Sequence, residues 1–186
     1  MAKLTLEKAK EILKKHTTEA HLFTHAAAVS AAMGAMAEYF GEDKAWWEAI
    51  GYLHDVDYEK FPTEHCQHVR ELLVGEDIDE YDISAIISHG WGLVSNEIEP
   101  SDNLMKSLFT VDELTGIVQA YALMREDKLA GMELKGLKKK FKDKSFAAKC
   151  DREVIKKGFD MLGLDAAVVM EQTLKGMQAH SDELGL

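Results

Sequence analysis

The sequence predicts an all-α protein, and three observations lead to that fold class. Apolar residues recur at spacings of three and four along most of the 186 residues, which is the period of an amphipathic helix. No stretch alternates apolar and polar residues for long enough to predict a β-strand. Only 2 prolines occur, so long helices are permitted. Because neither a repeat nor a linker divides the chain, we expect residues 1–186 to form one helical domain with short loops.

Capping signals delimit the helices expected in the first third of the chain. Thr5 is a candidate N-cap for a first helix. A second helix is expected from Glu19 to Phe40, where seven alanines between residues 26 and 37 make it thin enough for close packing. Gly41 is the candidate C-cap of that helix, and a third helix is expected from about Asp43 to His54.

The remaining helices follow the same apolar spacing, with glycines or polar residues between them. They are expected over about Thr63–Val74, Ile83–His89, Ser101–Arg125, Leu134–Phe141, Arg152–Leu162 and Asp165–His180. Pro62 stands in a helix-start position before the first of these helices, and Ser101 is a candidate N-cap for the third. The chain therefore predicts helices joined by short connections, and no sheet.

The charge of the chain is strongly acidic, with one basic exception. A formal net charge of −11 argues against general binding to nucleic acid or to an anionic membrane surface. Residues 135–149 nevertheless hold seven lysines against one acidic residue, which is +6 and leaves −17 for the rest of the chain. Such a run is usually a solvated face, but in this acidic background Lys139, Lys140 or Lys144 is expected to contact an anionic substrate.

The two cysteines and the apolar content indicate a cytoplasmic protein. Cys66 and Cys150 do not suggest a disulfide framework, and we expect neither to have the neighbours that an activated thiolate requires. The first sixteen residues are charged and amphipathic, unlike a signal peptide, and no apolar run approaches the ~20 residues of a membrane span. Without a nucleophile elbow or a glycine-rich phosphate loop, covalent catalysis is not expected.

Histidine and aspartate side chains mark the expected functional site. The dipeptide His54-Asp55 ends an apolar helical segment and combines nitrogen and oxygen donors suited to a divalent transition metal. Further donors occur on other helices or beside them, where a helical bundle can bring them together. The candidate donors are His25, His54, Asp55, His65, His68, His89 and Asp112.

The order His, His-Asp, Asp on three successive helices resembles the HD-domain superfamily of metal-dependent phosphohydrolases. The motifs that carry this resemblance are His25-Ala-Ala-Ala-Val29, Tyr52-Leu-His-Asp55 and Val111-Asp-Glu-Leu114. The resemblance covers about residues 21–121, which leaves a C-terminal helical extension over 132–186. It implies an HD-type helical bundle, and the chain looks like a group of small predicted HD hydrolases.

The same resemblance implies a set of metal ligands. His25, His54, Asp55 and Asp112 would hold one ion, and Asp55 would bridge to a second ion held by His65 and His89. The implied cofactor is one or two divalent ions of Fe, Mn, Zn, Ni or Co. His68, three residues after His65, is an alternative ligand. Many dinuclear members have glycine two residues after the aspartate, whereas this chain has Asp57.

The function this predicts is phosphoester hydrolysis by a metal-bound hydroxide, with Asp55 as the catalytic residue. The expected substrate is a small phosphorylated or nucleotide-like molecule. A di-iron oxygenase and a non-catalytic ligand-binding or signalling module are the alternatives. The sequence leaves the oligomeric state open.

Overall fold

The computed structural model describes residues 2–186, and these residues form ten helices. The helices are α1 (Leu6–His16), α2 (Ala20–Phe40), α3 (Lys44–Leu53), α4 (Val69–Leu72), α5 (Glu80–Ser88), α6 (Asn103–Met124), α7 (Leu134–Lys142), α8 (Arg152–Leu162), α9 (Ala166–Ala179) and α10 (Ser181–Leu184). Over the same residues the only β-type pairing is an isolated bridge between Trp91 and Ser95. The prediction of an all-α fold is confirmed.

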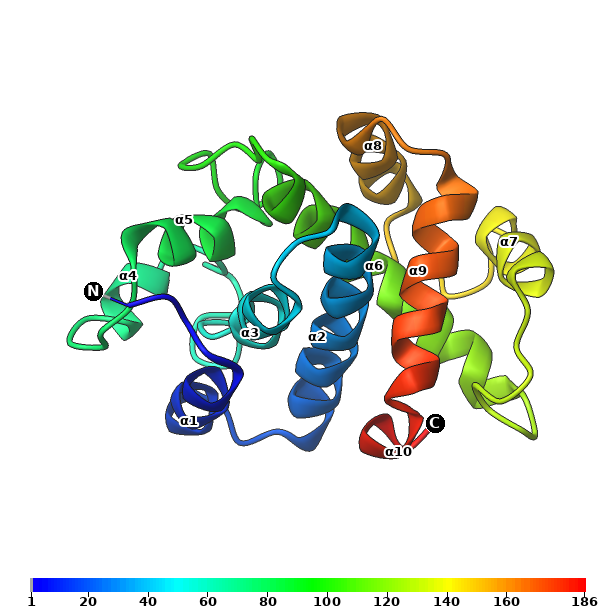
Figure 1. The fold of residues 1–186 in the computed structure, drawn as a ribbon, viewed down its shortest axis with the longest axis horizontal. Coiled ribbons are helices and arrows are strands. Elements are labelled where there is room, and N and C mark those ends of the chain that lie inside the picture. The colour runs from blue at the N-terminus through cyan, green and yellow to red at the C-terminus, as the bar shows by residue number, and fades with distance from the viewer. Residues whose placement is uncertain (1) are drawn as a thin grey trace.

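Helix α2 lies at the centre of the bundle (Figure 1), where it packs against α3, α6 and α9. Its alanines allow these neighbours to approach closely, as the sequence predicted. At the contact with α9, a Cβ atom on Gly176 would lie 2.4 Å from the carbonyl oxygen of Ala31. At the contact with α3, a Cβ atom on Gly51 would lie 3.1 Å from the carbonyl oxygen of Val29. The thin central helix thus allows α3 and α9 to pack directly against its backbone.

Most helix ends agree with the capping signals in the sequence. Thr5 accepts a hydrogen bond from the Lys8 amide at 3.1 Å, and Asp43 accepts one from the Trp46 amide at 3.2 Å. Gly41 ends α2 in the left-handed conformation with φ 70°, which glycine adopts without a steric penalty. Local signals therefore account for where these helices begin and end.

Three helix predictions need correction. Residues 63–68 form turns rather than the start of a helix. Cys66 adopts a left-handed φ of 70°, and the backbone amide of His68 donates a hydrogen bond to the buried Asp57 carboxylate. Only α4 remains of the helix expected over Thr63–Val74. The N-cap of α6 is Asp102, which accepts from the Met105 amide at 2.9 Å, and not Ser101. The short helix α10 was not predicted.

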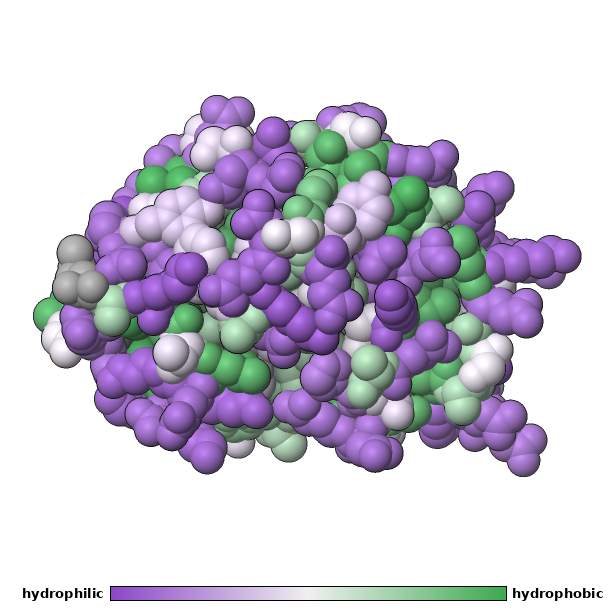
Figure 2. Space-filling model, viewed as in Figure 1, coloured by the Kyte–Doolittle hydropathy of each residue, from purple (hydrophilic) through white to green (hydrophobic). Residues whose placement is uncertain are grey.

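The surface is mainly hydrophilic on the face drawn in Figure 2, and long hydrophilic side chains project from the edge where Figure 1 places α7. This helix is amphipathic: Leu137 and Phe141 are buried, whereas Lys135, Lys138 and Lys139 are exposed. Within residues 2–186, no helix combines the length and apolar character that crossing a membrane requires.

Candidate metal centre

Four predicted donors from three helices meet in one group. His25 lies on α2, His54 and Asp55 follow the last turn of α3, and Asp112 lies on α6. One ligand atom from each lies within 4.8 Å of the others. The His25 Nε2 atom is 2.9 Å from Asp112 Oδ1 and 3.4 Å from Asp55 Oδ2, and His54 Nε2 is 3.2 Å from Asp112 Oδ1. Because α2 packs against both α3 and α6, the donors converge as the sequence order predicted.

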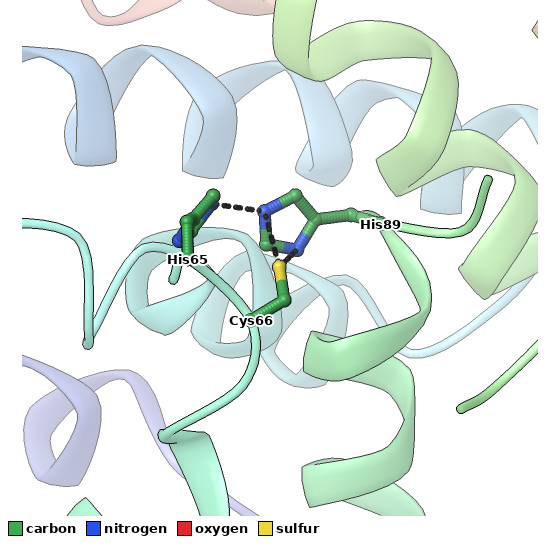
Figure 3. Close-up of side chains that lie close together, drawn as sticks. All are labelled: His65, Cys66 and His89. Carbon is green, nitrogen blue, oxygen red and sulfur yellow. Dashed lines mark hydrogen bonds between the residues drawn. The ribbon is translucent and has the colours of Figure 1, made fainter. Parts of the chain in front are cut away.

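A second group forms on the other side of Asp55. The Nε2 atoms of His65 and His89 lie 2.9 Å apart (the two rings are drawn in Figure 3). Their distances to Asp55 Oδ1 are 3.0 Å from His65 and 3.3 Å from His89. Asp55 therefore stands between two histidine-containing groups: Oδ2 faces His25, and Oδ1 lies within 3.3 Å of His54 from the first group and of His65 and His89 from the second. This is the position that a bridging carboxylate requires.

Two of the histidines are oriented by the ends of their own helices. The buried His54 donates from Nδ1 to the carbonyl oxygen of Gly51 at 2.6 Å, and His89 donates in the same way to Ile86 at 2.5 Å. Both residues are C-caps, where helix carbonyl groups lack an intrahelical donor. A proton held on Nδ1 leaves Nε2 free to face the cluster as a lone-pair donor, which suits a metal ligand.

Asp57 orients His65. Its side chain is fully buried, and Oδ1 accepts a hydrogen bond from His65 Nδ1 at 2.8 Å. The other oxygen accepts from the amide of His68 at 3.1 Å. The His68 ring lies elsewhere, with Nδ1 2.7 Å from Glu71 and its face stacked on Phe61. The structure thus brings His65 rather than His68 to the cluster.

Cys66 has neighbours that the sequence did not reveal. Its sulfur lies 3.6 Å from His89 Nε2, beneath the imidazole ring in the view of Figure 3. Burial alone would raise the pKa of this thiol, but His89 and His65 lower it to about 7. The expectation that Cys66 lacks activating neighbours is therefore wrong. The sequence hid this contact because Cys66 and His89 are 23 residues apart and come together only through the left-handed turn at Cys66.

The carboxylates and histidines of the cluster shift one another's proton affinity. Burial opposes a charge on His25, but its hydrogen bonds to Asp112 and Asp55 raise its pKa to about 10. Burial likewise disfavours the ionised form of Asp112, yet His54 and His25 hold the pKa of that carboxyl well below its ordinary range. The cluster therefore keeps its carboxylates ionised, and a cation that binds there competes with protons on the imidazoles.

A cavity of about 560 Å³ opens onto this cluster. It is lined by His21, Leu22, His25, Asp55, Tyr58, His65, Asp112, Glu113, Gly116, Gln119, Lys149 and Cys150. Burial and the neighbouring Asp112 raise the pKa of the Glu113 carboxyl to about 7. Glu113 can therefore both hold and release a proton near neutral pH. Nothing in the sequence distinguished it from other surface glutamates except its place directly after Asp112.

Lys149 is the lysine that borders this cavity. The three lysines named from the sequence lie at other places. Lys139 borders a separate cavity beside Tyr121, and the Lys140 ammonium lies 5.0 Å from the ring centre of Phe146. Lys144 borders a cavity next to Arg152. A substrate contact by Lys139, Lys140 or Lys144 stays a prediction.

An all-α bundle with histidine and aspartate groups facing one another defines a class of metal-binding helical proteins. A family model described as the HD domain matches residues 22–114, which is half of the chain. The chain therefore belongs to the HD-domain family. HD domains bind divalent metals, and the family consists in general of metal-dependent hydrolases. No curated protein matches the chain, and no solved structure matches it.

Proposed function

We propose that this protein is a metal-dependent phosphohydrolase that acts on a small phosphorylated or nucleotide-like substrate. The observation that carries the proposal is the position of Asp55, which lies between two donor groups at the base of a cavity. One carboxylate between two imidazole-containing groups is an arrangement suited to two divalent ions. The cavity volume of about 560 Å³ suits a small molecule.

The donor set fits divalent transition metals. His25, His54, Asp55 and Asp112 would hold one ion, and Asp55, His65 and His89 would hold the second. Imidazole nitrogen and carboxylate oxygen are ligands that Zn, Fe, Mn, Ni and Co accept in proteins. The Nε2 atoms of His54 and His89 already face the cluster, because backbone carbonyls hold their Nδ1 protons. Divalent metals bound there would polarise the phosphoryl group and supply an activated water.

The other residues of the cavity would bind the substrate and move a proton. Lys149 carries the positive charge that can contact a phosphoryl oxygen at the cavity wall. The Glu113 carboxylate, which borders the cavity directly after Asp112, would take up or return the proton that leaves the attacking water or joins the leaving oxygen. His65 would be held in place by Asp57, so that its Nε2 atom keeps its position during turnover.

The test begins with elemental analysis of the purified protein. The protein, loaded with the metal found, is then offered phosphomonoesters, nucleotides and cyclic nucleotides under anaerobic conditions. We expect phosphate or nucleotide product to form, and Asp55→Ala to abolish both the metal and the turnover while keeping the helical circular dichroism. A fully loaded protein that turns over none of these esters would contradict the proposal.

A di-iron oxygenase is the second candidate, and the composition of the cluster favours it. Four imidazoles and two carboxylates form a six-ligand set that suits two irons as well as two hydrolytic metals. Oxygen uptake by the iron-loaded protein, with no phosphate release under anaerobic conditions, would support this candidate over hydrolysis.

A further inference from the structure

The loop between α7 and α8, residues 143–151, forms one wall of the cavity at the metal centre. Lys149 and Cys150 border the cavity from this loop, and His21, Leu22 and His25 border it from α2. The loop contains no glycine, and Ala147 adopts a left-handed φ of 48°. A residue with a Cβ atom keeps that conformation only when surrounding contacts hold it. The contacts that hold this loop therefore decide where Lys149 stands.

Arg152 supplies most of these contacts. Its side chain is buried, with 7% exposure, and its guanidinium donates to six backbone carbonyl oxygens. The acceptors are Lys140 at 3.2 Å, Phe141 at 3.1 Å, Asp143 at 3.1 Å, Phe146 at 2.6 Å, Ala147 at 2.8 Å and Cys150 at 3.4 Å. Two of them belong to the end of α7 and four to the loop. One planar group thus fastens the loop to the last turn of α7, a task that a lysine ammonium cannot repeat.

The same loop is also attached to α6, close to the metal centre. The Asp151 amide donates to Glu113 Oε2 at 3.4 Å, and Glu113 directly follows Asp112. One turn further along α6, Gly116 makes room for the loop: a Cβ atom there would lie 2.7 Å from the Cys150 sulfur. In the sequence, Lys149 lies between Ala147 and the two residues that contact α6, Cys150 and Asp151. Its backbone is therefore placed relative to Asp112 by contacts on both sides.

We infer that Lys149 is the residue that contacts the anionic group of the substrate, and that Arg152 is the positioning residue that holds Lys149 there. The inference rests on the proposed function, since the anion is the phosphoryl group expected at the metals. The chain outside residues 135–149 has a charge of −17, so the exposed Lys149 ammonium at the cavity wall adds to the attraction that the metals exert on an anion. Arg152 acts through the loop because its hydrogen bonds go to backbone carbonyls rather than to the cavity.

The test measures binding of inorganic phosphate to the metal-loaded full-length protein by titration calorimetry. Lys149→Met should raise the dissociation constant for phosphate about tenfold at low ionic strength, as expected for the loss of one hydrogen bond to a charged group, with metal content unchanged. Arg152→Lys keeps the charge but loses most of the six bonds, and it should raise the constant by a similar factor. The double variant should bind no more weakly than either single variant, because both changes remove the same contact. Lys142→Met is the matched control: it removes one charge from the same lysine run and should bind phosphate like wild type.

The outcomes separate this inference from the proposed function. A loaded wild-type protein that binds no phosphate overturns both. Phosphate binding that is equally tight in wild type and Lys149→Met overturns only the inference, as does a double variant whose two effects multiply.

Should Arg152→Lys fail to fold, hydrogen exchange on the wild-type protein tests whether the loop of residues 143–151 is held in place. The amides of Phe146 and Cys150, which donate within the loop at 3.1 Å and 2.9 Å, should be protected. Exchange at the rate of a free peptide would overturn the role of Arg152.

Discussion

Replacing Asp57 with asparagine tests how the second donor group is built. Asparagine has nearly the same shape, and its side-chain oxygen can still accept from His65 Nδ1. The side-chain amide nitrogen of asparagine, however, would face the backbone amide of His68, which in the wild type donates a hydrogen bond to Asp57 Oδ2 at 3.1 Å. A donor then opposes a donor inside a fully buried site. We therefore expect Asp57→Asn to disturb both the turn at residues 63–68 and the orientation of His65.

The size of the effect follows from the bonds that are lost. A hydrogen bond to a buried charged group contributes about 1.5–3 kcal/mol. For a chain of this length, each kcal/mol shifts Tm by roughly 2–4 °C, so the metal-free variant should melt about 5–10 °C below wild type. Loss of a residue that orients a histidine ligand weakens metal binding by about 10–100-fold. That weakening should fall on the ion held by His65 and His89, and the ion held through His25 and Asp112 should bind as in wild type.

The assay is a metal titration followed by calorimetry, with melting temperature recorded in parallel. Glu59→Gln is the matched control, because Glu59 lies in the same loop and accepts amide hydrogen bonds from Thr18 and Glu19 at a distance from the cluster. The control should bind two ions with wild-type affinity. If Asp57→Asn also binds both ions with wild-type affinity, the hypothesis that Asp57 orients His65 as a metal ligand is wrong.

Three further predictions follow from the cluster and the lysines. His89→Ala should hold one metal where the loaded wild type holds two, by elemental analysis, and two ions in the variant would exclude His89 as a ligand. The pKa of His25 is raised from 6.5 to about 10, so this group stabilises the metal-free fold below pH 6.5 and loses that contribution as pH rises toward 10. The pKa values of His54, His65 and His89 are raised as well, so the free energy of unfolding in urea, with a chelator present, should fall by at least about 1.5 kcal/mol between pH 6.5 and 8; a flat pH response would contradict this. Replacing both Lys140 and Lys144 with alanine tests the contact predicted from the sequence: a raised KM for a charged substrate at low ionic strength would support it, whereas unchanged kinetics, which the place of Lys149 at the cavity leads us to expect, would assign both lysines to the solvated surface.

The sequence predicted the part of the site that helices determine. His25, His54 and Asp112 lie on or at the end of helices whose apolar spacing and caps are local signals, and packing of those helices brings the three residues together. The loop residues were harder to interpret. Asp57 stands where many dinuclear members of the family have glycine, and it accepts a hydrogen bond from His65 Nδ1 at 2.8 Å. Its partner lies eight residues away across an irregular turn, and no periodic pattern predicts such a contact.

The lysines show a second limit of reasoning from sequence. A run of positive charge predicts a potential, but the potential does not say which lysine faces the cavity. Helix α7 buries Leu137 and Phe141, so the orientation of its lysines is set by that apolar face. Lys149 follows the end of the helix, and its place depends on a guanidinium that binds six carbonyl groups. Arg152 looks like an ordinary helix-start residue in the sequence, because backbone acceptors leave no trace in side-chain composition.

The structure divides the centre into two parts with different origins. The donors near Asp112 are carried by long helices packed on the alanine-rich α2, whereas His65 comes from a turn held by the buried Asp57. Elements with many packed contacts open locally less often than turns do. The first donor group should therefore stay assembled under conditions that release His65. Asp55 belongs to both groups, so the first ion would keep the bridging carboxylate in place while the second ion exchanges. If two metals bind as proposed, we therefore expect them to load in order, first at His25 and Asp112 and then at His65 and His89, because one part of the centre is built from a helical bundle and the other from a turn.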